Sequence, residues 1–145
     1  MGASFEEKSV WIQLIGTLIG LGTYFAVAGR MIAAGTMALP AYVPVFIGAV
    51  VVMVAITVAG FIVAAVTGRT DGRDERDRLI GWRAESESGW IVAAGVVTAI
   101  TAMILDVHMV WIANGLLASL FVSEMVGYVL RIVYYRRGMS GAGGA

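Results

Sequence analysis

The chain contains no cysteine, so disulfides, thiolate metal sites, cysteine nucleophiles and thiol redox switches are all excluded. Histidine occurs once, as His108 beside Asp106, and a single imidazole provides too few ligands for a zinc site. We therefore interpret His108 as a turn residue. No Walker loop, dinucleotide-binding fingerprint, zincin motif or nucleophile elbow is present. The sequence thus indicates no catalytic centre, no metal and no cofactor.

Charged side chains are also scarce. They make up 14% of the 145 residues, and the ten acidic and ten basic groups cancel, so the overall charge does not favour nucleic acid. Hydrophobic residues make up 59% of the chain, and the mean hydropathy is +0.87. A chain this short has too little interior to hide so much apolar surface from water. We therefore expect the lipid bilayer to surround much of it.

Long apolar runs predict an all-α membrane protein with a single domain of four transmembrane helices, arranged as two hairpins. The last two runs form one apolar block, and an unbroken helix of that length would be roughly twice as long as the hydrocarbon core is thick. Its polar interruption, Asp106-Val107-His108, is therefore expected to be a tight turn. The four spans are placed at about residues 10–28, 43–67, 90–105 and 109–133.

One charged segment, residues 68–88, lies between the two apolar halves and holds eleven of the twenty acidic and basic side chains. Arg73 and Asp77, like Asp74 and Arg78, have the i,i+4 spacing of ion pairs on a helix. The spacing predicts a short surface helix, either separate from the third span or continuous with it and bent at a glycine, Gly81 or Gly89.

The charged segment has two interpretations. Its six carboxylates between residues 71 and 87 could bind a divalent cation, but five arginines between residues 69 and 83 compete for the same oxygens. A solvated, self-paired loop is the simpler interpretation, and a docking surface for a cytosolic protein is the functional one. The candidate docking residues are Asp74, Glu75, Arg76, Asp77 and Arg78.

Basic residues in short loops predict the orientation of the chain. Lys8, the arginines of the charged segment, Arg136 and Arg137 fall on one side of the membrane, whereas Arg30 falls on the other. We therefore expect both termini and the charged segment to be cytoplasmic. The glycine-rich residues 138–145 are expected to be a flexible tail.

Glu124 is the most informative single residue, because it lies within the fourth span, roughly 10 Å from its cytoplasmic boundary by helical rise. A carboxylate at that depth is costly unless it is protonated, hydrated or paired. Gln13 and Thr17, one turn apart in the first span, and the neighbouring Ser123 are candidate partners. Glu124 then either fixes helix packing or couples proton or cation movement.

Small residues mark the faces on which the helices are expected to pack. Gly16 and Gly20 are four residues apart in the first span. A second stripe at four-residue steps in the fourth span consists of Gly115, Ser119, Ser123 and Gly127. Such stripes join helices either within one chain or in a homodimer.

Three segments, residues 4–12, 74–80 and 133–138, together resemble a family of small bacterial four-helix membrane proteins without established activity. The resemblance spans the chain, with the Asp-Glu-Arg-Asp-Arg run as its most specific part, and implies a bacterial inner-membrane setting. The chain is also similar to the small multidrug resistance exporters in having four short helices and one membrane carboxylate. Those exporters carry their essential glutamate in the first span, where this chain has none.

Three functions follow in order of preference. The first is a non-enzymatic membrane protein that serves as an assembly or regulatory partner through its cytoplasmic segment, in a homodimer or with a larger protein. The second is a small proton- or cation-coupled transporter with Glu124 as the coupling carboxylate. The third, a lipid-modifying enzyme, is disfavoured because the chain has no evident nucleophile or metal cluster.

Overall fold

The computed structural model describes residues 5–67 and 75–137, and these residues form four long α-helices and one short 3-10 helix. Each long helix contains a segment long and apolar enough to cross a membrane. The prediction of an all-α chain with four candidate membrane spans is therefore confirmed. The elements are α1 (Phe5–Ala33), η1 (Leu39–Tyr42), α2 (Val43–Thr67), α3 (Glu75–Ile104) and α4 (Met109–Arg137).

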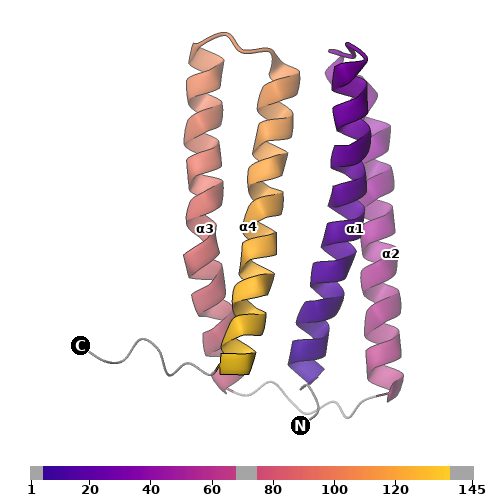
Figure 1. Cartoon of the computed structure of the whole chain (residues 1–145), viewed down its shortest axis with the longest axis vertical. Helices are drawn as coiled ribbons and strands as arrows, with labels where there is room; N and C mark the ends of the chain where they lie inside the picture. Colours follow the sequence, from indigo (N-terminus) through magenta and orange to yellow (C-terminus); the bar gives the residue numbers. More distant parts are fainter. Residues whose placement is uncertain (1–4, 68–74, 138–145) are drawn as a thin grey trace, which may run out of the picture.

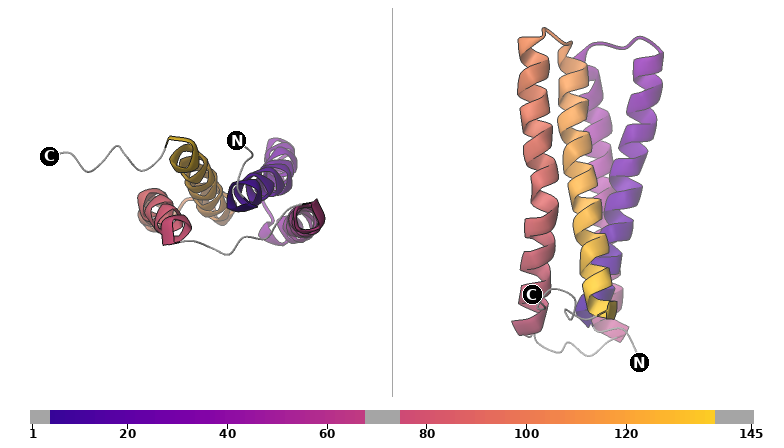
Figure 2. Two further views of the ribbon diagram at one scale, coloured as in Figure 1. Left: turned by 90° about the horizontal axis from the view of Figure 1, so that it is seen from below. Right: turned by 60° about the vertical axis from the view of Figure 1, so that its left-hand side comes forward.

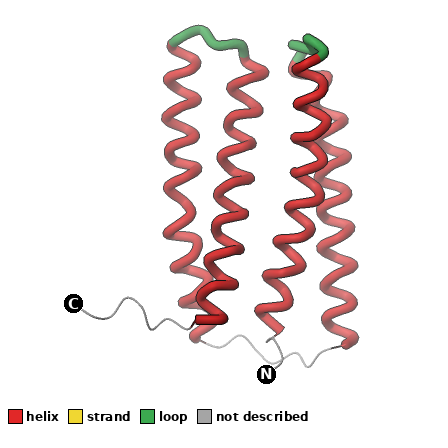
Figure 3. The backbone as a smooth tube through the Cα atoms, in the orientation of Figure 1, coloured by secondary structure: helices red, strands yellow, loops and turns green. Residues whose placement is uncertain are grey.

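The four helices run side by side along the long axis of the molecule, in the spatial order α3, α4, α1, α2 (Figures 1 and 2). α3 packs along α4, α1 packs along α2, and α1 also contacts α4. The starts of α1 and α3 and the ends of α2 and α4 lie together at one end of the bundle, which we call the charged end. The connections between α1 and α2 and between α3 and α4 lie at the opposite end, the turn end (Figure 3).

Both connections at the turn end begin in the same way. Gly35 after α1 and Asp106 after α3 have positive φ values of 79° and 57°, in the left-handed region that stops a helix. The amide of the next residue reaches back five positions in each case, from Thr36 to the Met31 carbonyl and from Val107 to the Ala102 carbonyl, both at 2.9 Å. The chain thus reverses at residues 105–108, where the sequence places a tight turn.

The charged segment differs from a loop, because α3 begins at Glu75 and continues without interruption through Gly81 and Gly89 to Ile104. A glycine inside a helix costs about 1 kcal/mol, but this part of α3 packs on α4, with Ala84 and Ser88 buried. The 30 residues of α3 extend about 45 Å against about 30 Å of hydrocarbon. If α3 crosses a bilayer, at least about a third of it lies outside the hydrocarbon, and all its charged side chains fall within residues 75–87.

Three expectations lie outside the described residues. They are the flexible tail at residues 138–145, the first part of the charged segment at residues 68–74, and the docking role of Asp74.

The outer surface of the described helices is strongly apolar, as Val66 at 81% and Ile104 at 78% exposure illustrate. Such a surface is stable only when lipid or another membrane helix covers it.

Candidate functional site

Glycines set the distance between α1 and α2. A Cβ atom added at Gly20 would lie 2.5 Å from the Cβ atom of Met53, and one at Gly16 would lie 2.6 Å from the Thr57 hydroxyl. Gly60 of α2, which the sequence analysis did not select, makes a similar close approach to Ile12 of α1. Gly20 lies against the backbone of α2, where a larger residue would push the helices apart, and Gly16 lies against the Thr57 side chain, so both glycines are at a helix contact.

Only part of the small-residue stripe on α4 contacts another helix of the chain. Ser119 lies directly against Gly95 of α3, and a Cβ atom at Gly127 would lie 3.2 Å from the Ser88 hydroxyl. Gly115 differs from the other stripe residues, because a Cβ atom there would meet no atom within 4 Å. Gly115 therefore makes no close contact within the described part of this chain.

Of the three residues expected to surround Glu124, Ser123 and Gln13 bond elsewhere. Ser123 is buried, and its hydroxyl donates to the Ser88 carbonyl of α3 at 2.9 Å. Gln13 donates from its side-chain amide to the Ser9 hydroxyl on its own helix at 3.3 Å. Ser123 thus joins α4 to α3, Gln13 bonds within α1, and neither bond involves Glu124.

Tyr128 is the residue that connects Glu124 with Thr17. The Glu124 side chain is exposed on α4 and interacts electrostatically with the Tyr128 hydroxyl, one turn nearer the charged end. The same hydroxyl is close to Thr17, which is buried on α1. The Arg131 guanidinium lies 6.0 Å from the centre of the Tyr128 ring. A polar line, Glu124–Tyr128–Arg131, thus follows α4 toward the charged end.

The charged first half of α3 is held against the last turns of α4 by several side-chain bonds. Arg131 donates to the Glu85 carboxylate, and the Tyr134 hydroxyl donates to the Glu87 carboxylate. Nearer the end of the bundle, the Tyr135 hydroxyl donates to Asp77 at 3.0 Å. These bonds fix the register of α3 on α4 beyond the apolar part of both helices.

Glu87 has a second partner on its own helix, the guanidinium of Arg83 at 2.9 Å. The hydrogen bond from Tyr134, followed by that from Arg83, lowers the pKa of the Glu87 carboxyl below its ordinary value. Glu87 precedes the apolar stretch of α3 that begins at Trp90, so a bilayer around that stretch would leave this charge outside the hydrocarbon.

α1 joins the charged end through one further ion pair. Nε of Arg136 lies 3.3 Å from a carboxylate oxygen of Glu7, and the Arg136 guanidinium lies 5.7 Å from the centre of the Trp11 ring. The pair is largely exposed on the arginine side, so its energetic contribution is small. Its effect is to place the start of α1 beside the end of α4.

The candidate docking residues do not form one uniform surface. Glu75, Arg76 and Arg78 are exposed on the first turns of α3. Asp77 is half-buried and turned toward Tyr135 of α4. The exposed part of the docking set is therefore carried on a helix whose orientation Asp77 helps to fix.

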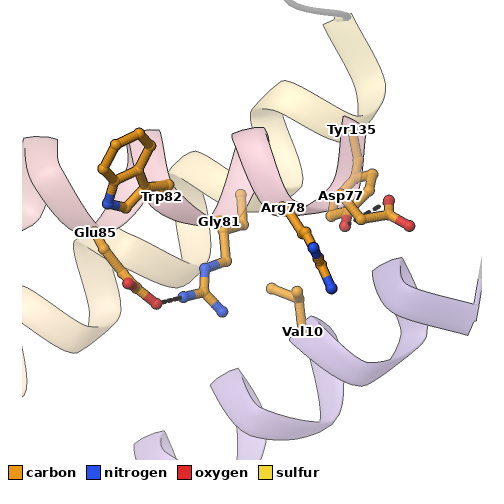
Figure 4. Close-up of a pocket in the computed structure, with 8 residues that line it drawn as sticks. Val10, Asp77, Arg78, Gly81, Trp82, Glu85 and Tyr135 are labelled. Carbon is orange, nitrogen blue, oxygen red and sulfur yellow. Dashed lines mark hydrogen bonds and ion pairs between the residues drawn. The ribbon is translucent and has the colours of Figure 1, made fainter. Parts of the chain in front are cut away.

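A cleft of about 330 Å³ opens at the charged end, where α3, α4 and the start of α1 meet (Figure 4). Val10 closes it on the α1 side, and Gly81 forms part of its wall on α3. The polar and aromatic side chains that line it are Asp77, Arg78, Trp82 and Glu85 from α3 and Arg131 and Tyr135 from α4.

A buried hydrogen bond joins the two helix pairs nearer the turn end. The Tyr24 hydroxyl of α1 donates to the side-chain oxygen of Asn114 in α4 at 2.9 Å, and the Asn114 amide donates to the Val110 carbonyl at 2.8 Å. Tyr24 and Asn114 are both buried. Neither residue was among the expected polar contacts, although an amide within an apolar span is itself a signal of such a contact.

His108 accepts a hydrogen bond at Nδ1 from the amide of Val110 at 3.3 Å, which caps the start of α4. No three histidine, aspartate or glutamate side chains gather as a metal site in residues 5–67 and 75–137. The polar features of the described helices with the most bearing on function are the line that starts at Glu124, the bonds between α3 and α4, and the cleft. Comparisons with protein-family models, with curated proteins and with solved structures gave no match, so function is argued from these features alone.

Proposed function

We propose that this chain is a non-catalytic membrane protein that assembles with a protein partner through the exposed charged face at the start of α3. The supporting observation is that this face belongs to the same uninterrupted helix as the third membrane span. Glu75, Arg76 and Arg78 are exposed there, whereas Asp77 bonds to Tyr135 of α4. The partner is a second copy of the chain or a larger protein.

A fixed helix is a better docking surface than a self-paired loop. Side chains on a mobile loop lose about 0.5–1.5 kcal/mol each when a partner immobilises them. The bonds of Asp77, Glu85 and Glu87 to α4 order the helix before any partner arrives. The charges of α3 are therefore presented in one arrangement, as specific recognition requires.

The setting that we propose is a bacterial inner membrane with both termini and the charged end in the cytoplasm. The excess of basic residues at this end supports that orientation. The likeness of residues 74–80 to small bacterial membrane proteins supports the compartment. Fusing a reporter that is active only in the cytoplasm to each terminus tests the orientation, and a signal from only one fusion would contradict it.

The docking face is tested by photocrosslinking in native membranes. A photoreactive residue replaces Leu79, which is 50% exposed beside the charged side chains. We expect a discrete crosslinked product that decreases severalfold when Arg76→Glu is added. The matched control is Arg137→Glu, another exposed arginine at the charged end, which should leave the product unchanged. A second probe at Ile104, at the turn end, reports nonspecific capture.

Two results would contradict the docking face. One is a product at position 79 that is no stronger than at position 104, and the other is a product that Arg76→Glu leaves intact. The mass of the product separates the two partners, since a second copy gives twice the mass of the chain. Circular dichroism of the purified variant confirms that Arg76→Glu leaves the helices folded.

The polar line from Glu124 through Tyr128 to Arg131 favours a second candidate function, a proton- or cation-coupled transporter. An exposed carboxylate within a span requires either a partner or access to water. In proteoliposomes, Glu124→Gln would then abolish a proton or cation flux while the crosslink at position 79 persists. Absence of any flux from the unmodified protein, across a range of imposed gradients, would contradict transport.

A further inference from the structure

We propose that the cleft at the charged end binds the phosphate group of a membrane phospholipid between Arg78 and Arg131. This site goes beyond the docking function. Arg78 belongs to both the docking face and the cleft, whereas Arg76 lies outside the cleft and Arg131 of α4 lies outside the docking face, so Arg76→Glu and Arg131→Gln separate the two. The donors that line the cleft, their existing partners and the position of the cleft support this site.

Arg131 provides the first donor. Its side chain is 18% exposed, and one terminal nitrogen donates to Glu85. Its Nε atom is buried and has no hydrogen-bond partner within the described part of the chain. A buried donor without a partner costs about 1–3 kcal/mol, more when it is charged. Nε is enclosed, so an anionic oxygen in the cleft would accept instead from the accessible part of the Arg131 guanidinium, which lines the cleft.

Arg78 provides the second donor, from the facing part of α3. Figure 4 shows its side chain reaching toward Val10 of α1, across the space between the helices. The structure records no ion pair between Arg78 and any other residue of 5–67 and 75–137. Two guanidinium groups on one cleft match the several oxygens of a phosphate, since each presents a planar fork of N–H donors.

The carboxylates of the cleft determine whether it favours free phosphate or the phosphate of a lipid. Asp77 accepts from Tyr135, and Glu85 accepts from Arg131. With Arg78 and Arg131 they bring the charge of the four side chains to zero, so the cleft does not concentrate free phosphate dianions from solution. Affinity must then come from local bonds together with a second source of binding energy.

The membrane is that second source. Trp82 lines the cleft with 76% of its surface exposed, and Leu79 is 50% exposed beside it. Tryptophan favours the headgroup level of a bilayer, where a lipid phosphate also lies. The acyl chains of a lipid would cover the apolar surface next to the cleft. The volume of about 330 Å³ equals that of roughly ten waters and suffices for a phosphodiester with its neighbouring atoms.

The test is native mass spectrometry of the full-length protein in detergent, titrated with phosphatidylglycerol. We expect one lipid adduct of highest affinity, weakened roughly tenfold by Arg78→Gln and by Arg131→Gln. The matched control is Arg83→Gln, because Arg83 bonds to Glu87 and lies outside the cleft. Arg131→Lys keeps the charge but loses the forked donors, so it should bind between the unmodified protein and Arg131→Gln.

Two further probes separate the possible occupants. Diacylglycerol with the same acyl chains lacks the phosphate and should give no high-affinity adduct, and inorganic phosphate should not displace the phospholipid. Equal binding of diacylglycerol would overturn the phosphate site. Displacement by inorganic phosphate at comparable concentration would overturn the lipid source. Arg78 is exposed, so unchanged binding in a folded Arg78→Gln protein also overturns the proposal, whatever Arg131→Gln does to folding.

Discussion

Gly20→Ala should destabilise the bundle, whereas Gly115→Ala should not, although both add one methyl group to an apolar helix. The new Cβ atom at position 20 would lie 2.5 Å from Met53 Cβ and 3.0 Å from the Ala49 carbonyl oxygen. Nonbonded carbon atoms prefer about 3.5–4.0 Å, so the backbones of α1 and α2 must separate by about 1 Å. At Gly115 no atom lies within 4 Å.

The magnitude follows from a comparison of the two variants. Replacing glycine by alanine inside a helix gains up to about 1 kcal/mol of helix propensity, and this term is common to both. Forcing an extra methyl group into a packed contact costs about 1–3 kcal/mol, and this term applies only at Gly20. The free energy of unfolding of Gly20→Ala should therefore be about 1–3 kcal/mol below that of Gly115→Ala.

The assay is reversible unfolding in mixed detergent micelles, followed by far-ultraviolet circular dichroism, with both variants measured side by side. Equal unfolding free energies for the two variants would refute the α1–α2 contact. A larger loss at Gly115 would refute it too, and would show that this face of α4 packs on something outside the described chain, with a second copy as the first candidate.

Two further contacts have measurable consequences. A double-mutant cycle with Tyr24→Phe and Asn114→Leu should give a coupling energy of about 0.6 kcal/mol or more, since hydrogen bonds between membrane helices average about 0.6 and reach about 1.7 kcal/mol and this bond is buried. A coupling energy near zero would mean that the bond does not join α1 to α4. Tyr134→Phe should raise the pKa of the Glu87 carboxyl toward its ordinary value, because the Tyr134 hydroxyl is the main cause of its depression. The stabilisation that this bond contributes is present above the ordinary carboxyl pKa and is lost as pH falls through the lowered value. A carbon-13 NMR titration of the glutamate carboxyls, with Arg83→Gln as the smaller perturbation, checks the order of the two effects.

The membrane helices were predictable because bilayer thickness imposes a length on every span. The extent of the helix that begins at residue 75 was harder to predict. Its charges predict a helix by their spacing, but Gly81 and Gly89 left open whether that helix joins the third span. The joining depends on burial of Ala84 and Ser88 against α4, a tertiary contact that local helix propensity does not include.

The expected partners of Glu124 were polar residues at a similar depth in their spans. Depth does not determine which side of a helix faces a neighbour. Gln13 and Thr17 lie at similar depth, yet Thr17 reaches Tyr128 while Gln13 bonds to Ser9. The pairing with Tyr128 follows from i,i+4 spacing on α4 itself, a signal that was present in the sequence.

The stripe of small residues on α4 also shows that sequence spacing alone does not determine which residues contact a neighbouring helix. Four residues advance a helix by about 40° beyond one full turn, so three such steps from Gly115 to Gly127 rotate the stripe by about 120°. Ser119, Ser123 and Gly127 contact α3, whereas Gly115 is exposed and lines a hollow between α3 and α4 together with Gly95 and Ala99. Spacing by four residues therefore identifies a close contact over about two turns.

Arg131 belongs both to the proposed lipid cleft and to the polar line that starts at Glu124. It pairs with Glu85 at the cleft and lies over Tyr128, the electrostatic partner of Glu124. A lipid phosphate on Arg131 would draw the guanidinium toward the cleft and weaken its influence on the polar line. If Glu124 couples transport, the flux should therefore depend on the presence of phospholipid, and Arg78→Gln should alter it without touching Glu124. If α3 only docks a partner, Arg131→Gln should change lipid retention while the crosslink at position 79 persists, because Arg131 lies on α4 in the cleft and outside the docking face.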